Sequence, residues 1–361
     1  MAKRHTMSRQ DEAHIIHYIK QISANSWLIG DWILTRSSPP LPSTSEYPSW
    51  IDEADNASYA FTSCSAPRSP PPTTTLDTAH IKLIYDCSNF SAVFSIGTKV
   101  MCKISVFNPS SSDASADITH EADTLSYVCS KQPNSFTTPR VIHSFNTAEN
   151  YAVLIMTRVA GRTLASMWKE MSEGAREACA KAVVAAIEEM MGWESDFLGG
   201  VNGKGIQEPF LVRGSSLGRD DSMYNPLAMH KFCEQVGMGM QPPFVFYHAD
   251  LGPTNVLVLD GTDTASTPSS STDSSSTNTF NSPKAAIGII DFEVAGFLPK
   301  DWIMTKFCVT GGMDLSFEDD DKVEGQDPVW WRMKVATGVR DKLGLRQVAH
   351  EWAKWKWMAE E

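Results

Sequence analysis

The chain has 361 residues, with 31 basic and 43 acidic side chains that give a formal net charge of −12. Such an acidic chain repels phosphate backbones and anionic lipid, so we expect neither a nucleic-acid partner nor a membrane partner. Hydrophobic residues make up 42% and charged residues 20%, which is typical of a globular chain long enough for about two domains.

The same sequence carries no sign of an oxidising or membrane compartment. Its seven cysteines lack Cys-x-x-Cys spacing, so neither a disulfide framework nor a zinc site is predicted. No apolar stretch reaches the ~18–20 residues that cross a bilayer. The first residues also lack the apolar core of a signal peptide. We therefore expect a cytoplasmic protein with reduced thiols.

The first part of the chain is predicted to lie outside the main fold. Four isoleucines between positions 15 and 22 recur at helical spacing, so residues 1–36 are expected to form an N-terminal helical extension. Residues 37–77 hold proline and serine runs that resist regular structure. We interpret this segment as a linker.

Residues 78–157 are predicted to form a small lobe with an antiparallel sheet. Gly97 and Thr98 provide a tight turn between two apolar runs, which favours antiparallel pairing. Thr119 is expected to cap a helix. In chain order the expected elements are strands at 81–85, 92–96 and 99–106, a helix at about 120–131 and a buried strand at 153–157.

Residues 158–361 are predicted to form a larger, mostly helical lobe. Ser172 opens the clearest helix, in which apolar residues recur every four positions. Two strand-like runs, 255–259 and 286–291, flank a Ser/Thr-rich insertion at 263–283. The tail is helical in pattern and rich in tryptophan. The expected fold class is α+β, with a small antiparallel-sheet N-lobe and a mostly helical C-lobe.

Polar side chains follow two of these strand-like runs. The apolar run 244–247 ends in His248-Ala-Asp250, and Asn255 falls five residues after the aspartate. A second apolar run ends in Asp291. If the strands pair, two carboxylates and an amide converge, and oxygen ligands of this kind suit Mg²⁺. The pattern predicts that Asn255 and Asp291 hold the metal while Asp250 acts as a base on a hydroxyl.

Phosphoryl transfer also requires a cation on the nucleotide phosphates. In the strand 99–106, Lys103 lies on the face opposite the alternating apolar residues. In the following helix, Glu121 lies on the apolar face, where a half-buried carboxylate needs a partner. We predict that Glu121 pairs with Lys103.

Five short motifs succeed one another between positions 93 and 307. They are Val100-Met-Cys-Lys103, Glu121-Ala-Asp-Thr-Leu125, Ile155-Met-Thr-Arg-Val-Ala-Gly161-Arg-Thr-Leu164, His248-Ala-Asp250-Leu-Gly-Pro-Thr-Asn255 and Ile290-Asp291-Phe-Glu-Val-Ala-Gly296. In this order they resemble the aminoglycoside phosphotransferase and choline kinase-like family, fungal-type phosphotransferases included. The resemblance implies a two-lobed protein kinase-like fold.

The resemblance further implies an enzyme that transfers a phosphoryl group from ATP to a hydroxyl of a small molecule with the help of Mg²⁺. The family pattern gives each matching residue of this chain an implied role. It assigns nucleotide binding to Lys103, Glu121 and Met156, the base to Asp250, magnesium binding to Asn255 and Asp291, and support of the catalytic loop to His248.

The chain also departs from the protein-kinase pattern. No Gly-x-Gly-x-x-Gly precedes Lys103, no lysine stands two residues after Asp250, and no Ala-Pro-Glu follows Asp291. The missing lysine and the missing Ala-Pro-Glu segment disfavour a protein acceptor. The missing glycine-rich loop motivates one alternative, a kinase-like binding protein that has lost efficient chemistry, and a protein kinase is kept as another alternative. Which small molecule accepts the phosphate, and which protein partners exist, does not follow from the residues.

Overall fold

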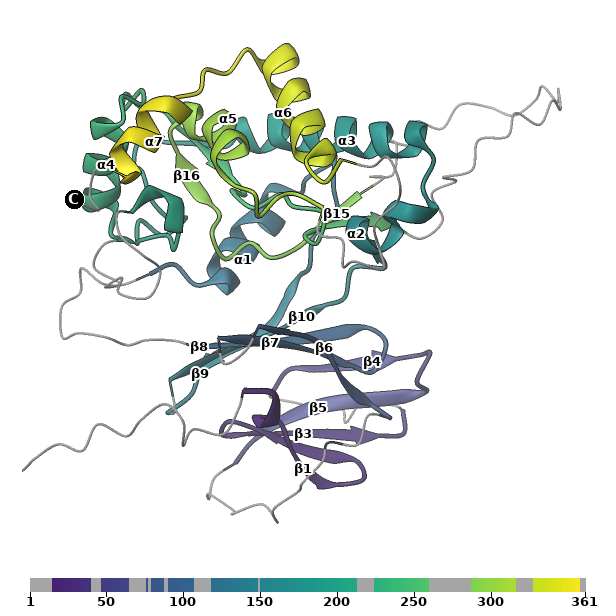
Figure 1. The fold of residues 1–361 in the computed structure, drawn as a ribbon. Coiled ribbons are helices and arrows are strands. Elements are labelled where there is room, and N and C mark those ends of the chain that lie inside the picture. The colour runs from purple at the N-terminus through teal and green to yellow at the C-terminus, as the bar shows by residue number, and fades with distance from the viewer. Residues whose placement is uncertain are drawn as a thin grey trace, which may run out of the picture. The chain divides into compact units, whose positions relative to one another are not determined.

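The computed structural model describes residues 15–39, 47–64, 76, 79–87, 90–106, 118–148, 150–212, 224–259, 287–315 and 327–357. Contacts divide the chain into two compact units, drawn in Figure 1. Unit 1 comprises Met1–Pro109 and Arg140–Arg158, and unit 2 comprises Ser110–Pro139 and Val159–Glu361. Strands build unit 1 and helices dominate unit 2, so the α+β class is confirmed. Within the described ranges, no helix combines the length and apolarity needed to traverse a lipid bilayer.

Unit 1 contains two five-stranded antiparallel sheets that share one hydrophobic core (Figure 1). Buried side chains of both sheets, among them Trp27, Phe61, Phe94 and Ile155, belong to a single cluster. The first sheet has the strand order β1 (Lys20–Ser23), β2 (Ser26–Ile29), β3 (Trp32–Ser37), β5 (Ala57–Ser63) and β4 (Ser49–Asp52). The second has the order β6 (Ile81–Cys87), β7 (Ser91–Ile96), β8 (Val100–Val106), β10 (Tyr151–Thr157) and β9 (Val141–Asn146).

The N-terminal helical extension predicted for residues 1–36 is wrong over residues 15–36, and residues 1–14 lie outside the described residues. The described part has one short 3-10 helix, η1 (Ile15–His17), followed by β1, β2 and β3. Trp27 and Ile29 are buried at alternate positions of β2, which is the period of a strand and not of a helix. The isoleucine spacing was misleading because Ile15 and Ile19 enter the core from the 3-10 turn and the residues after it.

The linker predicted for residues 37–77 is also corrected, because β4 and β5 lie within it. Ala57, Tyr59 and Phe61 of β5 are fully buried at alternate positions, so this strand belongs to the core. The proline- and serine-rich flanks that dominate the composition, at 40–46 and 65–75, lie outside the described residues.

The second sheet confirms the strands predicted between positions 81 and 157. Gly97 has φ +57° in the turn between β7 and β8, a left-handed conformation that favours glycine. The buried carboxylate of Asp52, at the end of β4, accepts a hydrogen bond from the hydroxyl of Thr98 at 2.7 Å and another from its backbone N–H. The two sheets are thus joined by a polar contact at this turn as well as by the core.

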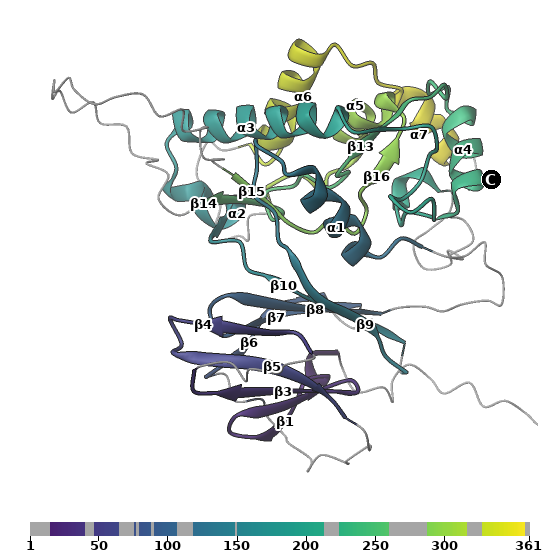
Figure 2. The same ribbon diagram turned by 180° about the vertical axis from the view of Figure 1, so that it is seen from behind.

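Unit 2 surrounds two small three-stranded sheets with helices. Helix α6 lies beside α3 and also contacts α5 (Figures 1 and 2). The helices are α1 (Glu121–Lys131), α2 (Leu164–Met167), η3 (Trp168–Glu170), α3 (Glu173–Met191), η4 (Pro209–Leu211), α4 (Pro226–Gln235), α5 (Lys300–Val309), α6 (Trp330–Leu343) and α7 (Ala349–Trp357). The sheets are β11 (Gly161–Thr163), β14 (Val256–Leu259) and β15 (Ile287–Ile289), and β12 (Glu194–Ser195), β13 (Phe244–Tyr247) and β16 (Gly296–Leu298).

Several local predictions for unit 2 are confirmed. Ser172 caps α3 by accepting a hydrogen bond from the backbone N–H of Ala175 at 3.2 Å. Strands β14 and β15 pair antiparallel, as the hairpin prediction requires. The tail forms α6 and α7, in which Trp331, Trp352 and Trp355 are buried. The Ser/Thr-rich insertion at 263–283 lies outside the described residues.

The helix α1 differs from its prediction in two respects. Its contacts place it in unit 2, whereas the sequence assigned it to the small lobe at 78–157. Thr119 does not cap it, because the N-cap residue is His120 and the Thr119 hydroxyl donates to Oδ1 of Asn202 at 2.6 Å. Glu121 therefore belongs to the same unit as the strand-end residues described next.

Candidate active site

The segment from His248 to Asn255 forms a tightly hydrogen-bonded loop between β13 and β14. Nδ1 of His248 accepts a hydrogen bond from the backbone N–H of Asp250 at 3.2 Å. Its other ring nitrogen, Nε2, therefore carries the proton and donates to the backbone oxygen of Ile290 at 2.9 Å. His248 is fully buried and both of its ring nitrogens are hydrogen-bonded, so it holds the loop against Ile290, the residue before Asp291. This geometry fits the supporting role that the family pattern implies for His248.

Asn255 holds Asp250 from the other end of the loop. Its Nδ2 donates to the backbone oxygen of Asp250 at 3.0 Å and to Oδ2 of the same residue at 2.9 Å. Because the side-chain nitrogen is used in this way, Oδ1 is the atom that Asn255 can offer to a cation. The backbone oxygen of Asn255 accepts from the N–H of Ile290 at 3.0 Å, which ties the loop to the end of β15. The predicted convergence of Asp250, Asn255 and the second strand end is observed.

Two residues of the site have left-handed backbone conformations that only glycine adopts freely. Ala249 has φ +63° and Asp291 has φ +67°. Such conformations cost roughly 1–3 kcal/mol each and are found where the surrounding structure imposes them, often at functional sites. The hydrogen bond between the ring of His248 and the N–H of Asp250 spans Ala249, and Asp291 is held by the hydrogen bonds of Ile290 before it and of Phe292 after it.

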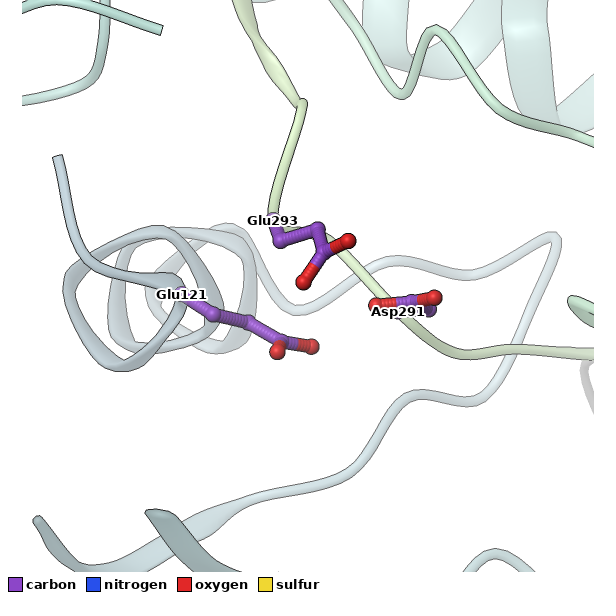
Figure 3. A group of neighbouring side chains, drawn as sticks. All are labelled: Glu121, Asp291 and Glu293. Atoms are coloured by element: carbon purple, nitrogen blue, oxygen red, sulfur yellow. The ribbon is translucent and has the colours of Figure 1, made fainter. Parts of the chain in front are cut away.

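A group of three carboxylates lies beside this loop. Glu121 of α1, Asp291 and Glu293 turn their carboxylates toward one common space, as Figure 3 shows. One oxygen from each side chain lies within 4.8 Å of the others. Oε1 of Glu121 also accepts a hydrogen bond from the backbone N–H of Phe292 at 3.0 Å, which anchors α1 to the segment after β15. Glu293 follows the predicted Asp291 by two residues and was not among the predicted ligands.

The carboxyl group of Asp250 is buried and has a raised pKa. Burial of the carboxylate is the largest cause and raises its pKa from 3.8 to about 6. Lys306 opposes this shift, while the negative charges of Asp291, Glu208 and Glu293 add to it. A carboxylate with this pKa is ionised near neutral pH and still basic enough to accept a proton from a hydroxyl.

The donor set suits a magnesium ion. Glu121, Asp291 and Glu293 offer carboxylate oxygens close to one another, and Mg²⁺ prefers hard oxygen ligands. Asn255 has an amide oxygen to offer as well, because its side-chain nitrogen is hydrogen-bonded to Asp250. No nitrogen or sulfur ligand stands among the residues of this group. Oxygen-rich groups with few protein ligands are typical where substrate phosphates complete the coordination. The residues present therefore fit the predicted metal.

The predicted nucleotide-binding residues divide between the two units. Lys103 in β8 and Met156 in β10 belong to unit 1, and Glu121 belongs to unit 2. Val100, Cys102 and Ile104 enter the shared core, which leaves Lys103 on the other face of its strand, as predicted. The pairing of Lys103 with Glu121, and the roles of Lys103 and Met156 toward a nucleotide, stay predictions.

A buried ion pair near the loop was not predicted from the sequence. Nζ of Lys306 in α5 lies 2.7 Å and 2.8 Å from the two carboxylate oxygens of Glu208, and the side chains are 4% and 0% exposed. The two residues are 98 positions apart, so no local pattern connects them. The lysine also lies 4.2 Å from the centre of the Phe210 ring. The position of Lys306 among the apolar residues of the second half of α5 was the sequence signal that could have suggested a buried partner.

Comparison with known proteins found similar solved structures but no related sequence among family models or curated proteins. No protein-family model matches the chain, and no curated protein matches it. Solved structures similar to this chain are aminoglycoside phosphotransferases. One is APH(3″)-Id from Streptomyces rimosus, with 14% identity, 76% of this chain and 91% of that chain covered, and a TM-score of 0.41. Another is APH(4)-Ia, with 14% identity, coverages of 74% and 79%, and a TM-score of 0.42.

A third similar structure is a complex of APH(2″)-IIIa with GDP and kanamycin, with 11% identity, coverages of 79% and 87% and a TM-score of 0.42. These structures come from the family that the five sequence motifs resemble, and they have the protein kinase-like fold. Because the TM-scores lie below 0.5, we base the function of this chain on its own residues.

Proposed function

We propose that the protein is a phosphotransferase that uses ATP and Mg²⁺ to phosphorylate a hydroxyl group of a small molecule. The observation that supports this most strongly is the joint placement of Asp250, Asn255 and Asp291. Hydrogen bonds among the loop, Asn255 and Ile290 bring these three residues of two separate motifs to the ends of neighbouring strands. In-line phosphoryl transfer depends on such positioning of a base and a metal.

Each residue has a distinct task in the proposed reaction. Asp250 accepts the proton of the acceptor hydroxyl, and its raised pKa suits that exchange. Asn255 keeps the Asp250 carboxylate oriented through the contact at 2.9 Å. Asn255 and Asp291 would hold the magnesium ion, which when bound neutralises charge on the ATP phosphates. Lys103, aided by Glu121, would bind those phosphates, and Met156 would line the nucleotide site.

The acceptor is proposed to be a small alcohol and not a protein. The protein-kinase features that follow Asp250 and Asp291, the loop lysine and the Ala-Pro-Glu segment, are missing from the sequence. Amino sugars, amino alcohols, simple sugars and hydroxylated secondary metabolites are the classes to screen. The fold leaves the choice among them open, because acceptor specificity depends on the site and not on the scaffold.

The experiment is a transfer assay with isotopically labelled ATP, Mg²⁺ and a panel of these alcohols. We expect labelled product with at least one acceptor, and a loss of about 10²–10⁴-fold in kcat for Asp250→Asn, since general-base catalysis contributes factors of this size. Asp341→Asn is the matched control, because Asp341 is exposed on α6 and pairs with its neighbour Arg340.

The outcomes separate the three candidate functions. Labelled small molecule that depends on Asp250 supports the proposal. Binding of ATP without transfer to any acceptor, and without ADP formation, supports a kinase-like binding protein. Label on added proteins supports a protein kinase. Equal turnover by wild type and Asp250→Asn contradicts the assignment of the base.

A further inference from the structure

The loop that carries Asp250 has four consecutive carbonyl groups, and each of them accepts a hydrogen bond. These are the backbone oxygens of residues 250 to 253. Their donors are Nδ2 of Asn255 for Asp250 (3.0 Å), Nε1 of Trp331 for Leu251 (3.1 Å), the N–H of Asn255 for Gly252 (3.0 Å) and the N–H of Ala165 for Pro253 (2.9 Å). The loop is therefore held along its whole length.

Trp331 differs from the other donors in this set. The others are backbone amides or the side chain of Asn255, which belongs to the same motif as Asp250. Trp331 comes from α6, 80 residues further along the chain. Its side chain and Leu251 are both fully buried, so water has no access to replace this hydrogen bond.

The indole of Trp331 is itself held in place from two sides. Its ring packs edge-on against Trp168 of η3, with a distance of 6.4 Å between ring centres. The next residue, Arg332, donates to the backbone oxygen of Phe307 at 2.7 Å and to Asp314 at 2.7 Å. These contacts hold the first turn of α6 against α5, and the ring contact with Trp168 restrains the indole of Trp331 within it.

We propose that Trp331 is a positioning residue for the catalytic loop, whose buried indole N–H holds Leu251 and thereby the adjacent Asp250 in reacting geometry. This inference rests on the proposed function where it concerns turnover, but its structural content does not. Without the donor, the Leu251 carbonyl is left buried and unsatisfied, and the loop relaxes around it. A misplacement of about 1 Å at a reacting group costs on the order of 10²-fold in rate.

The test compares Trp331→Phe with Trp352→Phe. Both variants keep an aromatic ring and lose one indole hydrogen bond to a backbone carbonyl, since Nε1 of Trp352 donates to Phe210 at 2.7 Å. Only the first variant affects the loop. Amide hydrogen exchange of peptides that cover residues 249–256 is followed by mass spectrometry, together with the kcat and KM of Mg²⁺-dependent ATP turnover with water or an identified acceptor.

For Trp331→Phe we expect loop exchange to accelerate about tenfold, the effect of one typical hydrogen bond. We also expect kcat to fall about ten- to a hundredfold with an unchanged KM for ATP. Trp352→Phe should leave both unchanged. Unaltered loop exchange in Trp331→Phe, or equal changes in the two variants, overturns the inference.

Two further controls keep the test decisive. If Trp331→Phe does not fold, Arg332→Gln replaces it, because it loosens the first turn of α6 without changing the indole, and the loop exchange must still rise. If the wild type turns over no ATP, the proposed function fails, and the exchange data alone decide whether Trp331 holds the loop.

Discussion

The buried ion pair between Lys306 and Glu208 allows a stability prediction with a defined magnitude. The change Lys306→Met keeps an unbranched apolar side chain of nearly the same length and removes the ammonium group. Glu208, which is fully buried, would then keep a negative charge without the cation that lies 2.7 Å away. Breaking one partner of such a pair costs about 3–5 kcal/mol of unfolding free energy. For a unit of this size, the melting temperature should fall on the order of 10 °C.

The assay is chemical and thermal denaturation of wild type, both single variants and the double variant. In Lys306→Met/Glu208→Gln no charge is left buried, and the new side-chain amide can still accept from the N–H of Phe210, as Glu208 does at 3.0 Å. The double variant should therefore lose less than the two single losses combined. The exposed pair of Arg162 and Glu170 is the control, and Arg162→Gln should leave the midpoint unchanged. A loss below about 1 kcal/mol for Lys306→Met, or strict additivity, would refute the reasoning.

Three other outcomes are expected. Asp250→Asn should stabilise the metal-free fold by up to about 3 kcal/mol at about pH 8, because folding raises the pKa of Asp250 to about 6 and the ionised carboxylate costs stability. In a denaturation series this gain should shrink as pH falls through about 6 and vanish near about 4; a gain that persists in acid contradicts it. Gly161→Ala should cost at least about 2 kcal/mol in the same assay, since φ is +149° and the new Cβ would lie 2.4 Å from the backbone oxygen of Val258; an unchanged midpoint would show that β11 shifts freely. Asp55→Asn should cost about 2 kcal/mol at neutral pH, because the hydrogen bond from Arg36 lowers the pKa of Asp55. That stabilisation is present above about pH 4 and is lost as pH falls through the folded pKa, so wild type and variant should converge in acid.

The placement of His248, Asp250, Asn255 and Asp291 was predictable because these residues belong to short local motifs. The spacing from His248 to Asn255 is short enough for one loop to satisfy its own polar groups, and the observed hydrogen bonds do so. The pairing of β14 with β15, inferred from two apolar runs, then brought Asp291 to the same place. Residues that contact one another within a short segment produce a spacing pattern that can be recognised in the sequence.

Contacts between distant segments could not be predicted in this way. Glu208 with Lys306, and Trp331 with Leu251, lie 98 and 80 positions apart, and each partner alone has an ordinary local setting. The sequence around a single buried lysine or tryptophan does not indicate which distant residue it contacts. The same holds for α1, whose helical pattern was clear but whose assignment to unit 2 depends on contacts made elsewhere in the chain.

The first sheet was missed for a different reason. Three of its strands, β1, β2 and β4, have four residues each. One stretch rich in proline and serine separates β3 from β4, and another follows β5. The helical spacing of the isoleucines led to a predicted helix, and the proline- and serine-rich composition led to a predicted linker. Both obscured the alternation of fully buried apolar side chains in β5. Alternate burial of Tyr59 and Phe61 shows that the period of two was the reliable signal.

Calorimetric titration of ATP into the purified protein, with and without Mg²⁺, tests the central claim most directly. The wild type and Asp291→Asn are measured in parallel. The proposed phosphotransferase should bind ATP tightly in the presence of Mg²⁺, and Asp291→Asn should lose the metal-dependent part of that affinity. No binding of ATP by the wild type under either condition would contradict the account.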